Sequence, residues 1–406
     1  QNGLMPMWIE WTIATKFLRE GKAQSTLIFV GISVGVAVIV FLIALITGLQ
    51  SNIIDRTLGT QAHIKIQPPQ ERNLILAPDK ASTHLVLESK RAQRLRSINN
   101  WQEVRDALDT TPQIKAVSPV IAGPAFVRRG EAAQSITLNG IDATRYSRII
   151  PIQNVIVSGV YRTGAGNALI GTQLANDLGL RLGDKLRIDG GQNRESIVSV
   201  AGIFEFGVRE LDSRHVYVDM RQAQSLLNLP GAATTIDVTV DDIFAAQTVA
   251  AGIARRTGLK AESWMETNAQ LMNALRSQSL STQMISTFVA LSVALGIASV
   301  LSVSVVQRTR EIGILRAMGA RQQQMLRVFL IQGALLGLAG SLLGGIAGYG
   351  LVGMFNMFGA TLFYIPLNPW LLVAATGLAT ITGIFSAALP ARRAAALDPV
   401  EAIRHG

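Results

Sequence analysis

The stretch Arg308–Arg321, RTREIGILRAMGAR, is dense in arginine, and no Asp, Glu, Lys, Arg or His occurs from Val328 to Ala391. A water-soluble domain needs charge on its solvated surface, so this second stretch belongs in another solvent. It is long enough for two helices of about 20 residues, the length that crosses a bilayer. We therefore expect a helical hairpin in a membrane, with the charged segment held against one end of it.

Composition supports a membrane protein. The chain has 406 residues, of which 49% are hydrophobic and 16% charged, whereas soluble domains have roughly 25% charged residues. A net charge of +10 could indicate nucleic-acid binding. However, residues 50–283 hold 26 Lys and Arg against 22 Asp and Glu. The remaining excess lies beside apolar runs, where basic residues set orientation, so we expect no nucleic-acid partner.

Charge-free intervals divide the chain into membrane and aqueous parts. We expect transmembrane helices over 26–49, 284–306, 328–354 and 370–389. The aqueous parts are then an N-terminal amphipathic segment (1–25), a large domain (50–283), a charged loop (307–327), a loop with aromatic residues (355–369) and a C-terminal segment (390–406). Residues 7–22 are either a helix lying on the inner leaflet or the ordinary flank of a membrane helix.

The distribution of basic residues predicts the orientation. The N-terminal segment, the Arg308–Arg327 loop and the C-terminus are net basic, and the hairpin loop carries no positive charge. Both termini and the arginine-rich loop are therefore expected in the cytosol, with the large domain outside. The expected fold is an α-helical membrane protein with four transmembrane helices and a large α+β extracytoplasmic domain inserted between helices 1 and 2.

Within this domain, alternating polar and apolar residues predict strands at 62–67, 134–138, 185–188, 196–204, 215–218 and 235–240. Helices are expected at 172–178, 221–227 and 243–257. Trp264–Gln283 also has helical character and runs straight into the second span, which predicts one continuous helix. Pro68–Asn100 is polar and irregular, and is either a mobile, solvated insertion or a site for an anion.

Small residues recur every four positions in two spans. The first has Gly31 and Gly35, and the third has two interleaved ladders: Gly333, Gly337, Ser341 and Gly345, and then Gly340, Gly344 and Gly348. Small residues let helix backbones approach closely in lipid, where van der Waals contact drives association. We therefore expect these residues at tight helix–helix contacts rather than against lipid.

The charged loop has the pattern of a short helix. Ile312, Leu315 and Met318 recur every three residues, and Gly319 can end the helix in a left-handed conformation. A loop that only sets topology needs arginine but neither of these features, so we expect a helix that docks on a cytosolic partner. Asp398-Pro-Val-Glu401 has the form of a further helix start.

Catalytic motifs are missing from the sequence. There is no G-x-x-x-x-G-K-[ST], no G-x-S-x-G and no cysteine, and His63, His84, His215 and His405 lack metal-site spacing. The four spans also contain no charged residue that could relay ions. We expect no catalytic, cofactor or metal site in this chain, so energy for work across the membrane must come from a partner.

The chain resembles the MacB/FtsX-type ABC transporter permeases. The resemblance rests on the order of spans and domain, on EIGILRAMGA at Glu311–Ala320, and on PARRAAALDPVEAIR at Pro390–Arg404. Within the family, Thr47–Gln50, Ile170–Asp184 and a Trp-bearing segment before the second span look most like the LolC/LolE lipoprotein-releasing permeases. LolC-type permeases carry a long hairpin that hooks a lipoprotein carrier, whereas Ile188–Ser196 is only a short turn here.

The resemblance implies a bacterial inner-membrane protein that works with a cytosolic ABC ATPase dimer, which would bind ATP and magnesium. It implies a dimer with a second copy or a paralogous permease, contact with membrane lipids, and a lipoprotein or a periplasmic adaptor as a further partner. It also makes the charged loop a coupling helix that fits into the ATPase. The residues carried over to that role are Arg310, Glu311, Ile312, Gly313, Leu315, Arg316, Met318, Gly319, Ala320 and Arg321.

The function implied is export or extraction of an amphiphile, a lipoprotein or a lipid-like molecule, on the periplasmic side. Two alternatives remain open. One is MacB-like efflux with a membrane-fusion adaptor, and the other is FtsX-like mechanotransmission to a periplasmic enzyme.

Overall fold

The computed structural model describes residues 7–20, 22–69, 95–164, 166–191, 194–359, 363–366 and 368–396. The chain forms two compact units. The helical unit comprises residues 1–54 and 273–406, and the sheet unit comprises residues 55–272. The helix start expected at Asp398 and most of the Pro68–Asn100 segment lie outside the described residues.

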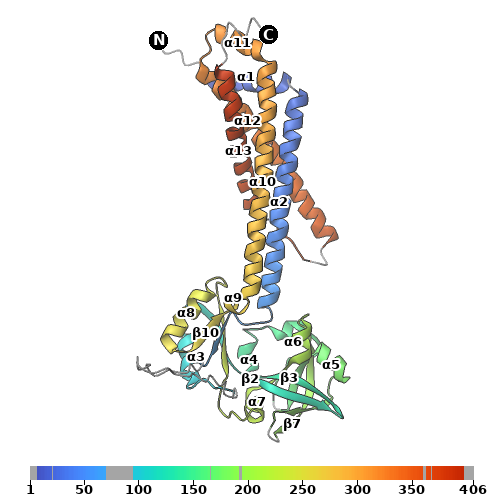
Figure 1. Cartoon of the computed structure of the whole chain (residues 1–406). Helices are drawn as coiled ribbons and strands as arrows, with labels where there is room; N and C mark the ends of the chain where they lie inside the picture. Colours follow the sequence, from blue (N-terminus) through green and yellow to red (C-terminus); the bar gives the residue numbers. More distant parts are fainter. Residues whose placement is uncertain are drawn as a thin grey trace, which may run out of the picture. The chain divides into compact units, whose positions relative to one another are not determined.

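In the part of the chain that the structure describes, the helical unit contains six helices, and Figure 1 shows how they are arranged. They are α1 (Met7–Glu20), α2 (Lys22–Leu58), α10 (Ala269–Gln307), α11 (Thr309–Ala317), α12 (Gln322–Phe358) and α13 (Pro369–Ala396). Four of them, α2, α10, α12 and α13, are long and apolar enough to cross a membrane. Their ends reach beyond the expected spans, because polar and charged residues at the ends of an apolar run can also be helical.

The fourth long helix shows this most clearly. The span expected to end at Leu389 continues through Pro390 to Ala396. A proline inside a helix removes one backbone N–H and crowds the preceding turn, which costs about 3 kcal/mol in an exposed helix. Here Pro390, Ala391 and Ala394 are buried. Packing of this last turn offsets the cost of the proline.

The helix expected to run without a break from Trp264 into the second span is interrupted. The four-residue helix α9 (Trp264–Thr267) ends at Asn268, and α10 begins at Ala269. Both the backbone N–H and the side-chain Nδ2 of Asn268 donate to the carbonyl of Trp264, at 2.9 and 2.7 Å. The first of these is an ordinary helical bond, whereas the side-chain bond competes for the same carbonyl, and α9 ends at Asn268, whose φ of −109° and ψ of 41° are not helical.

Among the described residues, ten strands form the sheet unit. They are β1 (Ile64–Gln67), β2 (Ile114–Arg129), β3 (Ala132–Ile141), β4 (Ile156–Gly159), β5 (Asn167–Gly171), β6 (Lys185–Asp189), β7 (Glu195–Phe204), β8 (His215–Asp219), β9 (Thr235–Val240) and β10 (Lys260–Ser263). Its helices are α3 (Trp101–Asp109), α4 (Ala143–Tyr146), α5 (Thr172–Leu178), α6 (Arg209–Arg214), α7 (Met220–Leu226), α8 (Ala246–Thr257) and α9, with a 3₁₀ turn at Ile152–Val155. All six segments predicted as strands contain one, and β2, β4, β5 and β10 were not foreseen.

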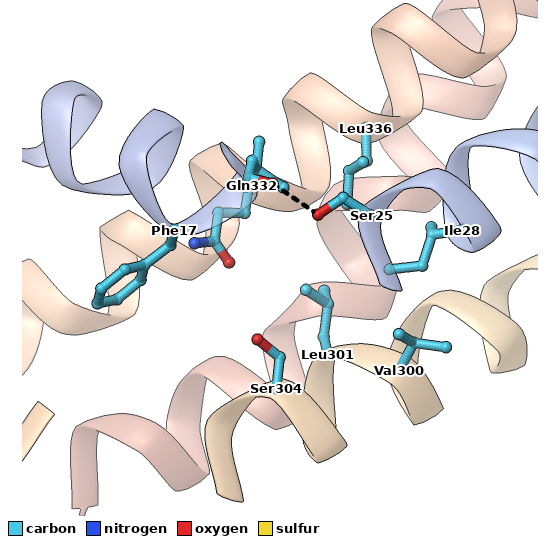
Figure 2. Close-up of a pocket in the computed structure, with 9 residues that line it drawn as sticks. Phe17, Ser25, Ile28, Val300, Leu301, Ser304, Gln332 and Leu336 are labelled. Carbon is cyan, nitrogen blue, oxygen red and sulfur yellow. Dashed lines mark hydrogen bonds between the residues drawn. The ribbon is translucent and has the colours of Figure 1, made fainter. Parts of the chain in front are cut away.

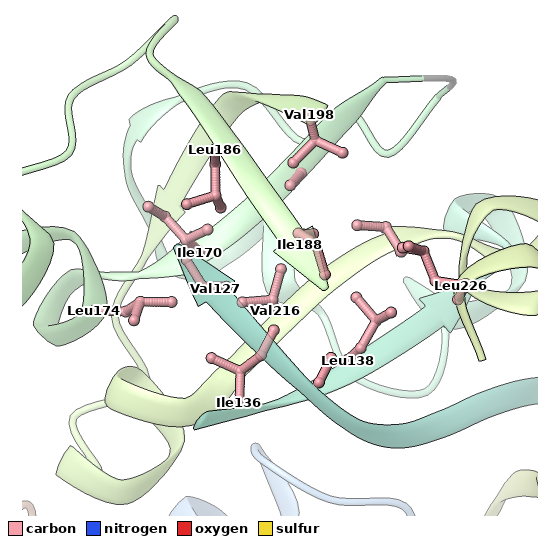
Figure 3. Close-up of a cluster of buried hydrophobic side chains, with 14 of the residues drawn as sticks. Val127, Ile136, Leu138, Ile170, Leu174, Leu186, Ile188, Val198, Val216 and Leu226 are labelled. Atoms are coloured by element: carbon pink, nitrogen blue, oxygen red, sulfur yellow. The ribbon is translucent and has the colours of Figure 1, made fainter. Parts of the chain in front are cut away.

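Six of the strands close into a barrel. Pairing runs from β2 to β3, β8, β5, β7 and β6, and β6 pairs back with β2. The barrel interior is filled by aliphatic side chains that point toward one another, as Figure 3 shows. Val127, Ile136, Ile170, Ile188 and Val216 are among them, and each is almost fully buried. A barrel of this size has room for side chains and not for a ligand.

The other part of the sheet unit is open. β10, β1, β9 and the first half of β2 lie side by side. Helix α8 packs on β10 and β1, and α3 packs on β2. Strand β2 belongs to both parts, because its residues 114–120 pair with β9 and its residues 126–128 pair with β6.

Candidate coupling site in the helical unit

The short helix α11 follows directly on α10. Arg308 stands between the two helices, and the backbone N–H of Ile312 donates to its carbonyl at 3.0 Å. The hydroxyl of Thr309 donates to the carbonyls of Val305 and Val306 at 3.2 and 2.8 Å. This hydroxyl satisfies carbonyls that the end of α10 leaves without an N–H partner. The chain can therefore turn from α10 into α11 within one residue.

Gly319 ends α11. It has a φ of +100°, which a residue with a side chain rarely adopts. The N–H of Gly319 donates to the carbonyl of Arg316 at 3.0 Å, and the N–H of Ala320 donates to that of Leu315 at 3.1 Å. These two bonds form a Schellman motif. The left-handed conformation expected for Gly319 is confirmed, and α12 starts three residues later at Gln322.

The inner side of α11 carries Ile312, which is fully buried. It packs in a core with Phe17 of α1, Val305 of α10, Phe329 of α12 and Ala394 of α13. This corrects the expectation that Ile312 faces a partner, since a side chain without exposed surface has none to offer. Gly313 is buried as well, and Leu315 lies half-buried against the same core.

The outer side of α11 presents a different pair of apolar residues. Ile314 is 44% exposed and Met318 is 72% exposed. They lie four residues apart, with Arg310 one turn before them, and all three are exposed. A search for residues four apart in the sequence would have found this exposed stripe of Arg310, Ile314 and Met318. The competing spacing of three in the sequence favoured Ile312 instead.

The remaining residues expected in the coupling helix are placed around this stripe. Glu311, Gly319 and Arg321 are exposed, and Ala320 is half-buried. Arg316 is half-buried, and its guanidinium donates to the carbonyl of Ala395 at 3.1 Å. Arg316 thus ties the end of α11 to the end of α13.

Helix α1 packs on the same end of the bundle. Glu10, Ala14 and Phe17 form its buried side, and Trp11 is 53% exposed on the other. The carboxylate of Glu10 lies 3.6 Å from the guanidinium of Arg327 on α12. The amide of Gln332, also on α12, reaches the carbonyl of Ala14 at 3.5 Å. These contacts make α1 part of the folded bundle.

The two glycine ladders of α12 face two different helices. Gly333 and Gly337 lie against α13, where an added Cβ would be 2.5 Å from the carbonyl oxygen of Gly383 and 3.0 Å from that of Ala379. Gly345 lies on the same side, against Leu372 of α13. Ser341, fully buried between them, donates to the carbonyl of Leu338 on its own helix at 3.0 Å.

The second ladder packs on α2. Added Cβ atoms at Gly340, Gly344 and Gly348 would lie 2.8 Å from Ile32 Cβ, 2.5 Å from the Ser33 carbonyl oxygen and 3.0 Å from Val40 Cβ. The Ser33 hydroxyl donates to the carbonyl of Gly340 at 3.0 Å. Helix α12 is therefore the central helix of the described bundle, because α2 and α13 pack on two of its sides.

The glycine pair of α2 behaves differently. Gly35 faces Val293 of α10, whereas an added Cβ at Gly31 would have no atom within 4 Å. Among the described residues of this chain, Gly31 has no neighbouring helix at this distance, so the expected contact at Gly31 stays a prediction.

A small cavity lies between these helices (Figure 2). Its volume is about 10 Å³, enough for one water molecule and far too small for an amphiphile. Ser25, Ser304 and Gln332 supply the polar groups around it. The Ser25 hydroxyl donates to the carbonyl of Leu18 at 3.0 Å. The cavity is not a site for transported cargo.

The titratable groups that the structure describes form no metal centre. Among the described residues, no three His, Cys, Asp or Glu side chains come together in a way that could hold a metal ion. His63 Nδ1 lies 3.1 Å from the carbonyl of Val240, and His215 lies beside Asn139 and Tyr217. Burial lowers the pKa of both histidines. Each is a partly buried residue of the sheet unit, in or next to a strand.

Four membrane-length helices joined to a separate sheet unit define a multi-span membrane protein with an extramembrane domain. Residues 25–256 match the MacB-like periplasmic core domain, and residues 283–399 match the FtsX-like permease C-terminal domain. The chain belongs to this family of bacterial inner-membrane ABC permeases.

Its relatives fall in two groups. The chain is 26% identical over 432 residues to the lipoprotein-releasing system transmembrane protein LolC of Xylella fastidiosa strain Temecula1, covering 97% of this chain and 98% of LolC. It is 22% identical over 446 residues to LolE of Haemophilus influenzae, covering 98% and 99%. It is 27% identical over 416 residues to the macrolide export ATP-binding/permease protein MacB of Shewanella sp. strain ANA-3. That match covers 94% of this chain but 58% of MacB.

Proposed function

We propose that this chain is the permease subunit of an ATP-driven ABC transporter. Hydrolysis of ATP by a cytosolic partner subunit would drive extraction or export of an amphiphile, a lipoprotein or a lipid-like molecule, on the periplasmic side. Relatives named for lipoprotein release match this chain over nearly their whole length. MacB is named as both an ATP-binding protein and a permease, and this chain spans 58% of it. ATP and magnesium would belong to the partner, because the given sequence contains no G-x-x-x-x-G-K-[ST] motif.

The observation that carries the proposal is the outer side of α11. Ile314 and Met318 are large apolar residues that stand exposed on a helix which Ile312 anchors in the core. A loop that only connects two spans has no need of such a pair. Burying each against a partner would contribute roughly 1.5–3 kcal/mol before the costs of association. Arg310 and Arg321 would form the polar rim of this contact.

The proposed topology places α11 and both termini in the cytosol and the sheet unit in the periplasm, inserted between the first and second spans. The basic residues of 307–327 favour this orientation. A functional transporter would contain a second copy or a paralogous permease, as the resemblance to this family implies. Cargo would then contact a surface shared between chains or the periplasmic domain.

A second candidate is MacB-like efflux with a periplasmic adaptor. Strands β6 and β7 pair directly from Asp189 to Glu195, so residues 190–194 are the whole connection between them. LolC-type permeases carry a long carrier hook at the corresponding place, whereas here only residues 190–194 separate the paired residues Asp189 and Glu195. This favours a partner other than a hooked carrier, while the ATP-driven coupling stays the same.

The test compares two exposed methionines. Met318 and Met357 are 72% and 76% exposed, and both lie in the helical unit. Met318→Gln should weaken binding of the ATPase that co-purifies with the wild-type chain by about tenfold, equal to about 1.4 kcal/mol. Met357→Gln should leave it unchanged. Affinity is measured with detergent-solubilised protein, and ATP hydrolysis is measured in proteoliposomes.

Equal ATPase affinity for the wild type and Met318→Gln would exclude α11 as the docking helix. Failure of the wild type to bind any ATPase would exclude the transporter itself.

A further inference from the structure

Arg308 connects three helices. It follows α10 and precedes α11, and its side chain reaches across to α1 with only 11% of its surface exposed. One guanidinium nitrogen donates to the backbone carbonyl of Phe17 at 2.9 Å. Another donates to the carboxylate of Glu20 at 3.1 Å. The guanidinium carbon also lies 4.7 Å from the centre of the Phe17 ring.

The position of this arginine is electrostatically unusual. A helix N-terminus carries partial positive charge and favours anions, so a cation at the first cap of α11 is unfavourable. Two carboxylates balance it here. Glu20 comes from α1, and Glu311 of α11 lies 3.6 Å away. Without α1, the buried charge of Arg308 would lose its carbonyl, its ring and one of its two carboxylates.

Helix α1 is held independently on α12. Glu10 pairs with Arg327, Gln332 reaches the Ala14 carbonyl, and the rings of Phe17 and Phe329 lie 6.4 Å apart. Phe17 is thus in contact with Arg308 on one side and with α12 on the other. A displacement of α11 cannot leave α1 behind without breaking the Arg308 contacts.

We propose that Arg308 is a positioning residue that holds α1 and α11 together as one body during ATP-driven coupling. The inference rests on the proposed docking of an ATPase on α11. Force delivered at the exposed side of α11 then reaches α12 through α1, in addition to passing along the chain into α10 and α12 and through the core around Ile312. In this proposal, α1 transmits force between α11 and α12, a role that its amphipathic sequence alone does not indicate.

Lysine cannot reproduce these contacts. The planar guanidinium donates to the Phe17 carbonyl and to Glu20 at once while lying over the ring, whereas an ammonium group is a single point charge on a flexible stem. Arg308→Lys should therefore retain part of the coupling, and Arg308→Gln should lose most of it. Arg19→Gln is the matched control, because Arg19 is an exposed arginine of α1 beside Glu20.

The first experiment measures ATP hydrolysis and ATPase affinity for each complex in proteoliposomes. Arg308→Gln should lower the kcat of permease-dependent ATP hydrolysis about tenfold, with the KM for ATP and the ATPase affinity within about twofold of wild type. The kcat of Arg308→Lys should lie between those of the wild type and Arg308→Gln, and the kcat of Arg19→Gln should match that of the wild type. An unchanged kcat for Arg308→Gln, or a loss that appears in ATPase affinity instead, would overturn the positioning role.

The second experiment replaces the ionic contact by a covalent one. The chain contains no cysteine, so Glu20→Cys with Arg308→Cys creates a unique pair that a short bismaleimide can bridge. Before cross-linking, the double variant should hydrolyse ATP slowly. Cross-linking of the same sample should restore the rate of hydrolysis. If cross-linking leaves hydrolysis slow, α1 and α11 do not act as one body.

These outcomes separate the two proposals. A wild-type chain that binds no ATPase removes the proposed function and this inference with it. A wild-type chain that couples normally, with Arg308→Gln equally active, removes only the role of Arg308. A loss of folding in Arg308→Gln would be seen in thermal unfolding. In that case, ATP hydrolysis by the double variant before and after cross-linking tests whether α1 and α11 act as one body.

Discussion

Asp237 is a buried carboxylate in the sheet unit. It lies on β9, in register with Lys65 on β1 and Ser118 on β2, and its side chain is almost fully covered. Its Oδ1 atom has no hydrogen-bond partner among the described residues, and the same holds for the hydroxyls of Thr235 and Thr239. Burial raises the pKa of Asp237, while the charge of Lys65 opposes this shift.

The raised pKa predicts how stability depends on pH. The folded sheet unit keeps a proton on Asp237 at pH values where the unfolded chain, with a carboxyl pKa of about 3.9, has released it. The stabilisation is therefore fully present below the unfolded pKa and is lost as pH rises through the raised folded pKa. Asp237→Asn should remove this slope and stabilise the unit at pH 7 by on the order of 1 kcal/mol.

Thermal unfolding of the purified chain, measured from below the unfolded carboxyl pKa of about 3.9 up to pH 7, checks the prediction. Asp241→Asn, at an exposed position next to the same strand, is the control and should retain the slope. If the stability of Asp237→Asn still falls with rising pH as in the wild type, another titratable group causes this dependence.

The sequence predicted β9 but not the environment of its polar residues. Alternation in Thr235–Val240 is typical of a strand with one solvated face. The structure buries all six residues. Tyr146 and Ile152, from α4 and the turn after it, pack with Ala116 and Val120 on the neighbouring strand β2. Such covering segments are distant in the chain, so local periodicity carries no information about them.

At the scale of elements, α12 shows what spacing predicts and what it leaves open. The ladders at intervals of four correctly indicated small residues that lie against other helices. Nothing in the spacing said that one ladder packs on α13 and the other on α2. That choice depends on how three helices cross, which is a property of all their side chains together.

Glycine substitutions within α12 should separate packing from helix propensity. An alanine Cβ at Gly344 would lie 2.5 Å from the Ser33 carbonyl oxygen, whereas at Gly350 it would have no atom within 4 Å. Alanine favours a helix over glycine by about 1 kcal/mol in water. Gly350→Ala should therefore be neutral or stabilising, and Gly344→Ala should destabilise by roughly 1–3 kcal/mol through overpacking.

The unfolding temperatures of the two variants in one detergent provide the comparison. Gly31→Ala, also without a neighbour in this chain, should behave like Gly350→Ala. Equal stability of Gly344→Ala and Gly350→Ala would mean that α2 does not approach α12 as closely as described.

At the scale of the whole molecule, the charge-free runs predicted the four long apolar helices, and all four exist. The bilayer requirement is local in sequence, because each span must satisfy its backbone internally. The barrel was not predictable in the same way. Its closure depends on pairs such as Phe126 with Asp189 and Thr137 with His215, far apart in the chain.

The proposed topology can be tested with single cysteines in this cysteine-free chain. Glu131 is exposed between β2 and β3, and Gln323 is exposed in the first turn of α12. On intact spheroplasts, a membrane-impermeant maleimide should label Glu131→Cys and should reach Gln323→Cys only after permeabilisation. If Gln323→Cys were labelled on intact spheroplasts, the first turn of α12 would lie outside the cytosol and the proposed orientation would be wrong.

Strand β2 has a consequence for how the sheet unit folds. Its first half belongs to the open sheet and its second half to the barrel. A slip of one residue along a strand turns every side chain to the opposite face. In β2 such a slip would empty the barrel interior and expose the apolar side of the open sheet together. Neither part can settle into an alternative alignment alone, so the two should form and melt in a single cooperative transition.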